Sequence, residues 1–250
     1  MGNYYIVMPA YKAKHTIQQT IEKIPYEVYN FIKEIIIVED VNNIDEQSAS
    51  QELLKNFKKC KVIFHKKNLG YGAAQKTGYK YCMKEKCDGV VLLHSDGQYN
   101  PKYLRKFLNF IEKDEVDVVQ GSRMINPGEA IKGGMPLWKY ALNKITTFFE
   151  NLLYKTDYSE FHSGYMAYSR NALKNIPFEN LSNTFHFDGE MLIMTKIKNL
   201  KFKAFPIETH YGDETSSLNP LSYAFQIIAV VLNYIKRKYH SIKVNENRFD

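Results

Sequence analysis

Polar residues or glycines follow each of several short apolar runs in the first half of the chain. These groups are Pro9-Ala10-Tyr11, Glu39-Asp40, Asn68-Leu69-Gly70-Tyr71-Gly72, Asp96-Gly97-Gln98 and Gly121-Ser122-Arg123. An aromatic face beside carboxylates suits a nucleoside base. Carboxylate and amide oxygens suit Mg²⁺ or Mn²⁺, and an arginine fork suits a phosphate. The residue types predict a site for a nucleoside diphosphate with a divalent cation.

The stretch VVLLHSDGQYNP, from Val90 to Pro101, carries the metal-binding part of this prediction. An apolar run ends at His94, and Asp96 and Gln98 follow as oxygen ligands. Asp-Gly is also a common turn pair, and Asn-Pro begins helices well. A plain turn is therefore the alternative for Asp96. In the same way Tyr11 could be a packed aromatic side chain, Glu39 and Asp40 could cap a helix, and Arg123 could be a surface residue.

The elements that must position these residues read as alternating strands and helices. Several strands are continuous apolar runs, the pattern of a parallel sheet covered on both faces. The predicted strands are Tyr4–Met8, Glu34–Val38, Val62–His65, Gly89–Leu93 and Asp117–Gln120. The predicted helices are His15–Ile24, Glu46–Phe57, Tyr71–Glu85 and Pro101–Glu112. In a doubly wound α/β sheet of this kind, ligands bind at the carboxyl ends of the strands.

The second half is less regular and begins with a glycine-rich loop, Asn126–Pro136. Gly164–Ser169 alternates like an antiparallel strand, and Lys203–Ile207 is a further strand. The predicted helices are Trp138–Tyr154, Phe187–Leu200 and a long one, Leu221–Tyr239. These elements predict one large α/β core with a C-terminal helical tail.

Composition excludes several classes of protein. The formal charge of +7 and the pI of about 9.0 suit an anionic partner. The excess charge is spread out and no nucleic-acid recognition motif is present, so we expect no nucleic-acid partner. The chain has three cysteines without metal-ligand spacing. It shows no signal-peptide pattern and no apolar run of roughly 18 residues. These features together predict a cytoplasmic protein. The segment GYGAAQ (Gly70–Gln75) has glutamine where a dinucleotide-binding fingerprint has a small residue, and it follows the third strand instead of the first. A Rossmann-type NAD site is therefore not expected.

Taken together, the segments resemble a family 2 glycosyltransferase with the GT-A fold, of the dolichyl-phosphate mannosyltransferase-like type. The resemblance covers about Tyr4 to Ser217 through VMPAYKAKHTI, EIIIVEDVNNID, KKNLGYGAAQKTG, VVLLHSDGQYNP, VVQGSRM, FHSGYMAYSR and FHFDGEMLI…FPIETHYGDETS. It implies a GT-A (Rossmann-like), mostly parallel sheet and an inverting transfer from a nucleoside-diphosphate sugar of the UDP or GDP type. It divides the chain into a nucleotide-sugar half (1–125), an acceptor-side half (126–217) and a tail (218–250).

The resemblance also implies roles for individual residues. The implied nucleotide-binding residues are Pro9, Ala10, Tyr11, Glu39, Asp40, Asn68, Gly70, Lys76, Ser95, Asp96 and Arg123. Mg²⁺ or Mn²⁺ would be held by Asp96 and Gln98. The family usually has Asp-x-Asp-x-Gln here, and His94 replaces the first acid, either as an imidazole ligand or as a strand-end residue. His210, in THYGDETSS, is a further metal candidate.

A hydroxyl acceptor needs a carboxylate base, whereas a phosphate acceptor is already ionised. Asp188 is the first choice for that base and Glu190 the second, with a helix cap and first-turn acid as the alternative. Related sequences often have arginine where this chain has Met166, and the lost charge favours a hydroxyl of a cell-surface glycan or lipid-linked acceptor. A polyprenyl-phosphate acceptor, a non-catalytic nucleotide-sugar binder and, last, a nucleotidyltransferase are the alternatives.

The C-terminal helix has an apolar stretch, Ala224–Leu232, followed by the basic cluster Lys236-Arg237-Lys238. It could pack on the core or form a homodimer contact. It could also lie on an anionic bilayer as a peripheral contact at the inner face of the membrane.

Overall fold

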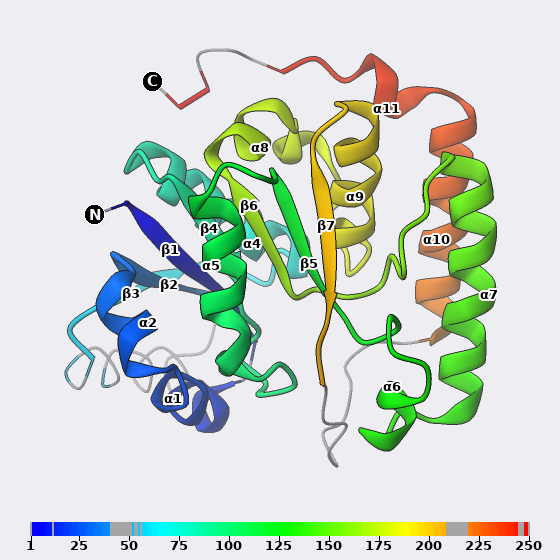
Figure 1. The fold of residues 1–250 in the computed structure, drawn as a ribbon. Helices are drawn as coiled ribbons and strands as arrows, with labels where there is room; N and C mark the ends of the chain where they lie inside the picture. The colour runs from blue at the N-terminus through cyan, green and yellow to red at the C-terminus, as the bar shows by residue number, and fades with distance from the viewer. Residues whose placement is uncertain are drawn as a thin grey trace.

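The computed structural model describes residues 2–11, 13–40, 52, 55, 57–208, 220–244 and 248–249. One sheet of seven strands forms the centre of the molecule, in the order β3-β2-β1-β4-β6-β5-β7 (Figure 1). The strands are β1 (Tyr4–Ala10), β2 (Glu34–Glu39), β3 (Cys60–Phe64), β4 (Gly89–Leu92), β5 (Val118–Ser122), β6 (Met166–Ser169) and β7 (Phe202–Pro206). The predicted α/β fold with a mostly parallel sheet is confirmed.

The strand directions agree with the predicted mostly parallel sheet and with the antiparallel strand predicted at Gly164–Ser169. β3, β2, β1 and β4 are parallel neighbours. The strand β6 runs antiparallel to both β4 and β5, and β7 is parallel to β5. The carboxyl ends of the parallel strands therefore meet at one edge, which is where a ligand site is expected.

Helices cover both faces of the sheet because successive strand residues point to opposite sides. Tyr5 and Val7 of β1 pack with α4 (Tyr71–Lys84), α8 (Arg170–Asn175) and α9 (Phe187–Ile197). Ile6 and Met8 pack on the other face, with α1 (Lys14–Glu22), α2 (Tyr26–Phe31) and α5 (Leu104–Glu112). Burial on both faces explains why these strands are continuous apolar runs.

The remaining helices lie mostly in the second half. They are η1 (Pro101–Tyr103), α6 (Glu129–Lys132), α7 (Leu137–Tyr154), η2 (Phe178–Asn180), α10 (Pro220–Ile235) and α11 (Lys238–Ser241). Figure 1 shows α7 and α10 side by side beyond the β7 end of the sheet, with α11 at their upper end.

Two helix predictions differ from the structure, and a third, Glu46–Phe57, falls largely outside the described residues and stays a prediction. The helix predicted from Pro101 begins as a 3₁₀ turn, which the Asn100 side chain caps by accepting a hydrogen bond from the Lys102 amide. The long C-terminal helix is not continuous: Arg237 adopts a left-handed conformation (φ +57°). This turn directs the chain back so that Tyr239 reaches Glu190 of α9.

Candidate active site

Hydrogen bonds link the ends of β1, β2 and β4 at the carboxyl edge of the sheet. The Ser95 hydroxyl donates to the Pro9 carbonyl oxygen at 2.8 Å, and the Asp40 amide donates to the Ala10 carbonyl oxygen. Tyr11 follows β1 and is 46% exposed, whereas Glu39 and Asp40 are buried. The structure thus brings these predicted nucleotide-site residues to one edge, with Tyr11 as the aromatic ring that is open to solvent.

The Asp40 carboxylate organises the loop after β3. It accepts hydrogen bonds from the Leu69 and Gly70 amides, both at 2.7 Å, and it pairs with His65 Nδ1 at 2.7 Å. Gly70 has φ +99°, and a Cβ there would lie 2.4 Å from the Asn183 carbonyl oxygen. Asp40 therefore holds a turn that only glycine fits.

Lys76 is turned toward backbone oxygen atoms of the segment 179–183. Its ammonium group donates to the carbonyl oxygens of Glu179 and Leu181 and to Asn183 Oδ1. Burial lowers the pKa of this lysine. Asn68 is exposed on the loop after β3. A contact of Lys76 or Asn68 with a nucleotide stays a prediction, and the positioning of the 179–183 segment is the role that these bonds give Lys76.

A chain of hydrogen bonds holds Asp188 at the start of α9. The Tyr71 hydroxyl donates to Asp188 Oδ2 at 2.7 Å, and Gln75 Nε2 donates to Oδ1 at 3.0 Å. The Tyr79 hydroxyl in turn donates to Gln75 Oε1 at 2.7 Å. Burial raises the pKa of the Asp188 carboxyl, against the opposing influence of His94 and of the two hydrogen bonds. Burial thus makes this carboxylate a stronger base than an ordinary aspartate, while the two hydrogen bonds fix its orientation.

The same Tyr71 hydroxyl lies 2.7 Å from His94 Nε2. Because Tyr71 gives its one proton to the Asp188 carboxylate, its oxygen must accept from His94, and Nε2 carries the hydrogen. In the neutral imidazole, Nδ1 then presents a lone pair. Nδ1 lies 4.0 Å from Asp96 Oδ2, so an imidazole nitrogen and a carboxylate oxygen face a common region at the end of β4.

This donor set fits a divalent cation that a diphosphate also helps to hold. Asp96 is half-exposed, its Oδ1 accepts from the Gln98 amide at 2.9 Å, and Gly97 makes the turn with φ +77°. An imidazole nitrogen and a carboxylate oxygen 4.0 Å apart can both contact one cation. Among the described residues no group of three or more His, Cys, Asp or Glu side chains is placed to hold a metal. His210 lies outside those residues.

Glu190 lies one helical turn into α9 and binds other partners. Its Oε2 accepts from the Ser182 amide at 2.8 Å and from the Ser182 hydroxyl at 2.5 Å. Its Oε1 accepts from the Tyr239 hydroxyl at 2.7 Å. Glu190 thus joins the C-terminal segment to the core, whereas Asp188 shares the His94 and Tyr71 network.

Arg123, at the end of β5, is buried against Glu160. Its Nε lies 3.1 Å from Glu160 Oε2, its amide donates to Glu160 Oε1 at 2.9 Å, and a second guanidinium nitrogen donates to the His162 carbonyl oxygen at 2.6 Å. Glu160 is completely buried. A phosphate contact of Arg123 stays a prediction; the structure fixes the guanidinium through this ion pair.

The sequence analysis missed the partners that orient the predicted residues. Tyr71, Gln75 and Tyr79 recur every four residues in α4, so they share one helix face. That spacing could have predicted that the three side chains lie together. No such pattern indicates the role of Glu160, because it lies in an irregular segment between α7 and β6.

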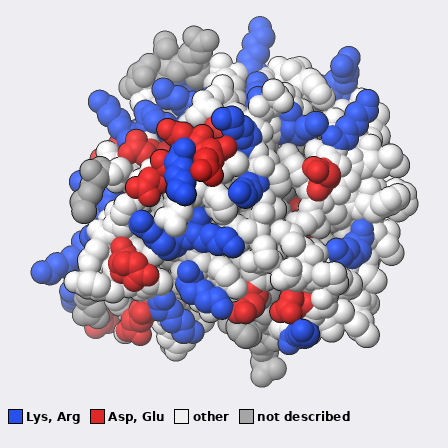
Figure 2. All heavy atoms as spheres, viewed as in Figure 1, with Lys and Arg blue, Asp and Glu red and all other residues white. Residues whose placement is uncertain are grey.

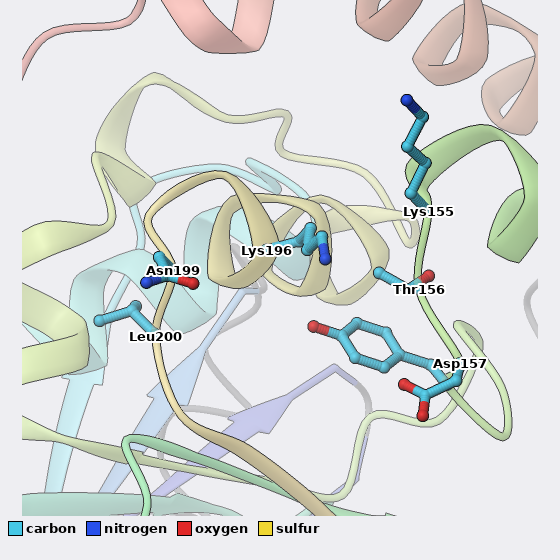
Figure 3. A pocket seen from close by; sticks show the side chains of 7 residues that line it. Lys155, Thr156, Asp157, Lys196, Asn199 and Leu200 are labelled. Carbon is cyan, nitrogen blue, oxygen red and sulfur yellow. The ribbon is translucent and has the colours of Figure 1, made fainter.

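A separate pocket of about 430 Å³ lies near the C-terminal ends of α7 and α9 (Figure 3). Its lining residues are Lys155, Thr156, Asp157, Tyr158, Lys196, Asn199 and Leu200. None of the predicted site residues lines it, so it is distinct from the carboxyl-edge site.

Comparison with known proteins agrees with this geometry. The family model for Glycosyl transferase family 2 matches residues 5–177. Uncharacterized protein MJ1222 of Methanocaldococcus jannaschii is 30% identical over 213 residues, which cover 85% of this chain and 84% of the relative. UDP-N-acetylglucosamine--dolichyl-phosphate N-acetylglucosaminyltransferase of Methanococcus voltae is 29% identical, and the match covers 84% of this chain and 86% of that protein.

Among solved structures, glucosyl-3-phosphoglycerate synthase of Mycobacterium tuberculosis, in complex with Mn²⁺, UDP and phosphoglyceric acid, superposes with a TM-score of 0.65 at 14% identity. The match covers 97% of this chain and 80% of the synthase. At this identity the likeness shows the fold, which is GT-A. The chain belongs to glycosyl transferase family 2 and is a glycosyltransferase.

Proposed function

We propose that this chain is a metal-dependent, inverting glycosyltransferase that moves a sugar from a nucleoside-diphosphate donor to a hydroxyl of a lipid-linked or cell-surface glycan acceptor. The observation that carries the proposal is the hydrogen-bonded path from Asp188 through Tyr71 to His94, with Asp96 beside it. This path supports the proposal because it links a buried carboxylate to His94, one of the side chains that we propose as metal ligands.

In the proposed reaction Asp188 is the general base. Its carboxylate accepts the proton of the acceptor hydroxyl while the hydroxyl oxygen attacks the anomeric carbon from the face opposite the diphosphate. The glycosidic bond forms, the bond to the diphosphate breaks, and the anomeric configuration inverts. Tyr71 and Gln75 keep the carboxylate in one orientation by donating to its two oxygens, which favours a productive geometry.

Asp96, His94 and Gln98 are the residues that would hold Mg²⁺ or Mn²⁺, together with oxygens of the diphosphate. A cation held there would supply charge stabilisation for the leaving diphosphate. His210 stays a proposed additional ligand. On the nucleotide side, the exposed ring of Tyr11 offers a stacking surface for the base, and the remaining residues predicted there shape the edge around it.

A UDP sugar is the first donor to test. The Methanococcus voltae relative is named for UDP-N-acetylglucosamine, and the solved Mycobacterium tuberculosis synthase is in complex with UDP and Mn²⁺. A lipid-linked acceptor agrees with the dolichyl phosphate in the name of that same relative.

The dolichyl phosphate in that name also motivates a second candidate, transfer to a polyprenyl phosphate. The phosphate oxygen is already ionised, so this reaction needs no base. Met166, where related sequences often have arginine, is completely buried in the apolar cluster under α4 and α9 and adds no charge toward a phosphate. The first candidate is favoured because a buried carboxylate with a fixed orientation suits the base that a hydroxyl acceptor needs.

The experiment measures UDP or GDP release from a panel of nucleotide sugars with Mn²⁺ or Mg²⁺, with and without acceptor. We expect release from at least one donor, and loss of release in Asp96→Ala. Donor binding without release from any donor would support a non-catalytic nucleotide-sugar binder instead. Glu115→Gln, an exposed acid three residues before the amino end of β5 and so at the edge of the sheet opposite the proposed site, is the matched control and keeps wild-type release.

A further inference from the structure

Two helices at one flank of the molecule expose large apolar side chains to solvent. Trp138, Phe148 and Leu152 on α7 are 60%, 64% and 70% exposed, and Phe225 and Ile228 on α10 are 71% and 53% exposed. We call these five residues the apolar flank. Figure 2 shows the surface over α7 as mostly uncharged, with isolated basic side chains. A monomer rarely exposes a large contiguous apolar patch unless the patch binds something.

The apolar flank does not include the faces of α7 and α10 that pack on the core. Asn143, Thr147, Glu150 and Tyr154 are the buried residues of α7, so they form its inner face. Tyr154 stacks edge-on with Tyr234 of α10 at 4.7 Å between ring centroids, and Val230 of α10 is buried in the same cluster. The inner faces are therefore occupied, and the exposed rings project outward.

The charged side chains of α7 and α10 that reach solvent are all basic, and the exposed Asp157 lies two residues beyond Lys155. Between Leu137 and Tyr154 the one acidic residue is Glu150, which is buried, and no acidic residue occurs between Pro220 and Val244. The exposed Lys155 follows α7, and the exposed Lys236-Arg237-Lys238 cluster follows α10. Figure 1 shows that both helices run in the same direction. Their basic ends therefore border the same end of the apolar flank.

We propose that α7 and α10 together dock this glycosyltransferase on an anionic lipid bilayer, with the apolar flank in the headgroup–acyl boundary and the basic ends at the headgroups. Apolar side chains with a cationic border are the pattern of interfacial helices. An anionic bilayer is complementary to the basic border, whereas in a symmetric dimer neither copy would offer an exposed acidic residue of α7 or α10 to pair with it. No helix among the described residues is long and apolar enough to cross a membrane, so the contact lies in the plane of the interface.

The chain provides its own probe for this contact. Trp138 is its one tryptophan and belongs to the apolar flank. We expect its fluorescence emission to shift to shorter wavelength when vesicles of equimolar phosphatidylcholine and phosphatidylglycerol are added. Brominated acyl chains should quench it. Vesicles of phosphatidylcholine alone should give a weaker effect at equal lipid, because the basic border then has no anionic partner.

Two variants separate the apolar and the charged contributions. Phe148→Ser with Leu152→Ser should weaken vesicle affinity by at least about tenfold, since each lost apolar group reduces the buried area. Lys236→Glu with Lys238→Glu should remove the preference for anionic vesicles. Tyr26→Ser, on α2 and 80% exposed, is the matched control and keeps wild-type vesicle binding. All of these side chains are exposed, and the melting temperature of each variant checks its fold.

The surface is independent of the proposed reaction, so the two can fail separately. Binding of UDP with Mn²⁺, followed by calorimetry, should be equal in the wild type and in all three variants. An emission maximum that no vesicle composition shifts overturns the docking proposal. So does a concentration-dependent dimer with Trp138 already shielded in the absence of lipid, because a second copy would then be the occupant.

Discussion

The Tyr71 hydroxyl donates a hydrogen bond to the Asp188 carboxylate at 2.7 Å, across 117 residues of sequence. This bond joins the first residue of α4 to the first turn of α9. Since Tyr71 also contacts His94, it links the end of β4 to the proposed base. One side chain thus determines the orientation of the carboxylate and the tautomer of the histidine.

Removing this hydroxyl should change the pH dependence of transfer. The hydrogen bond from Tyr71 lowers the Asp188 pKa against the larger effect of burial, so Tyr71→Phe should raise it further. Because the base must be ionised, the acid limb of the kcat/KM profile should move to higher pH. Tyr81→Phe makes the same change near the other end of α4, where the hydroxyl contacts Glu34 and Lys61, and it should leave the profile in place. An unmoved acid limb in Tyr71→Phe would exclude Asp188 as the titrating base.

The stability of Asp188→Asn should depend on pH in a defined direction. Burial raises the folded-state pKa of Asp188, so the stability that its proton contributes is complete below the unfolded-state pKa of about 3.9 and is lost as pH rises through the folded-state value. Asparagine stays neutral, and it can accept from Gln75 while it donates to the Tyr71 oxygen. We expect a higher melting temperature than that of the wild type above neutral pH, with the gain disappearing near the unfolded-state pKa. A lower melting temperature at every pH would contradict this account.

His94 should tune the choice of metal. An imidazole nitrogen favours later transition metals, whereas carboxylate oxygens favour Mg²⁺. His94→Asp restores the usual first acid of the motif, and it introduces a smaller side chain where the imidazole now lies against Gly164. In calorimetric titrations with UDP present, we expect the ratio of the Mg²⁺ to the Mn²⁺ dissociation constant to fall relative to the wild type. An unchanged ratio would mean that His94 is not a ligand.

Asp40 should contribute to stability through the loop that it holds. Asp40→Asn places an amide donor against the Leu69 or Gly70 amide, and a buried donor without an acceptor costs about 1–3 kcal/mol. Urea denaturation should show a loss of that order in the free energy of unfolding. Glu115→Gln, which removes an exposed charge, should change it by less than about 0.5 kcal/mol. If both variants unfold at the same urea concentration, the Asp40 bonds carry no net stability.

The sheet was predictable because its strands are apolar on both faces and polar or glycine-rich at their ends. The same patterns placed Asp96 and Gln98 in the turn after β4. The sequence did not predict the partners of these residues, because they come from distant segments: Glu160 for Arg123, the 179–183 segment for Lys76, and Tyr71 for Asp188. Periodicity also predicted α7 as a helix, but apolar residues around much of its circumference hid which face would stay exposed.

The most direct test of the proposed mechanism compares two carboxylates on one helix. With a hydroxyl acceptor and a donor identified by UDP or GDP release, Asp188→Asn should lower kcat by about 10²- to 10⁴-fold, the usual contribution of a general base, with little change in donor KM. Glu190→Gln disturbs the bonds to Ser182 and Tyr239 and removes a charge that favours the Lys76 ammonium. It leaves the Asp188 hydrogen bonds in place, so it should keep most of the wild-type kcat per folded molecule. Wild-type kcat in Asp188→Asn, or loss of turnover in folded Glu190→Gln alone, would contradict the assignment of Asp188 as the base.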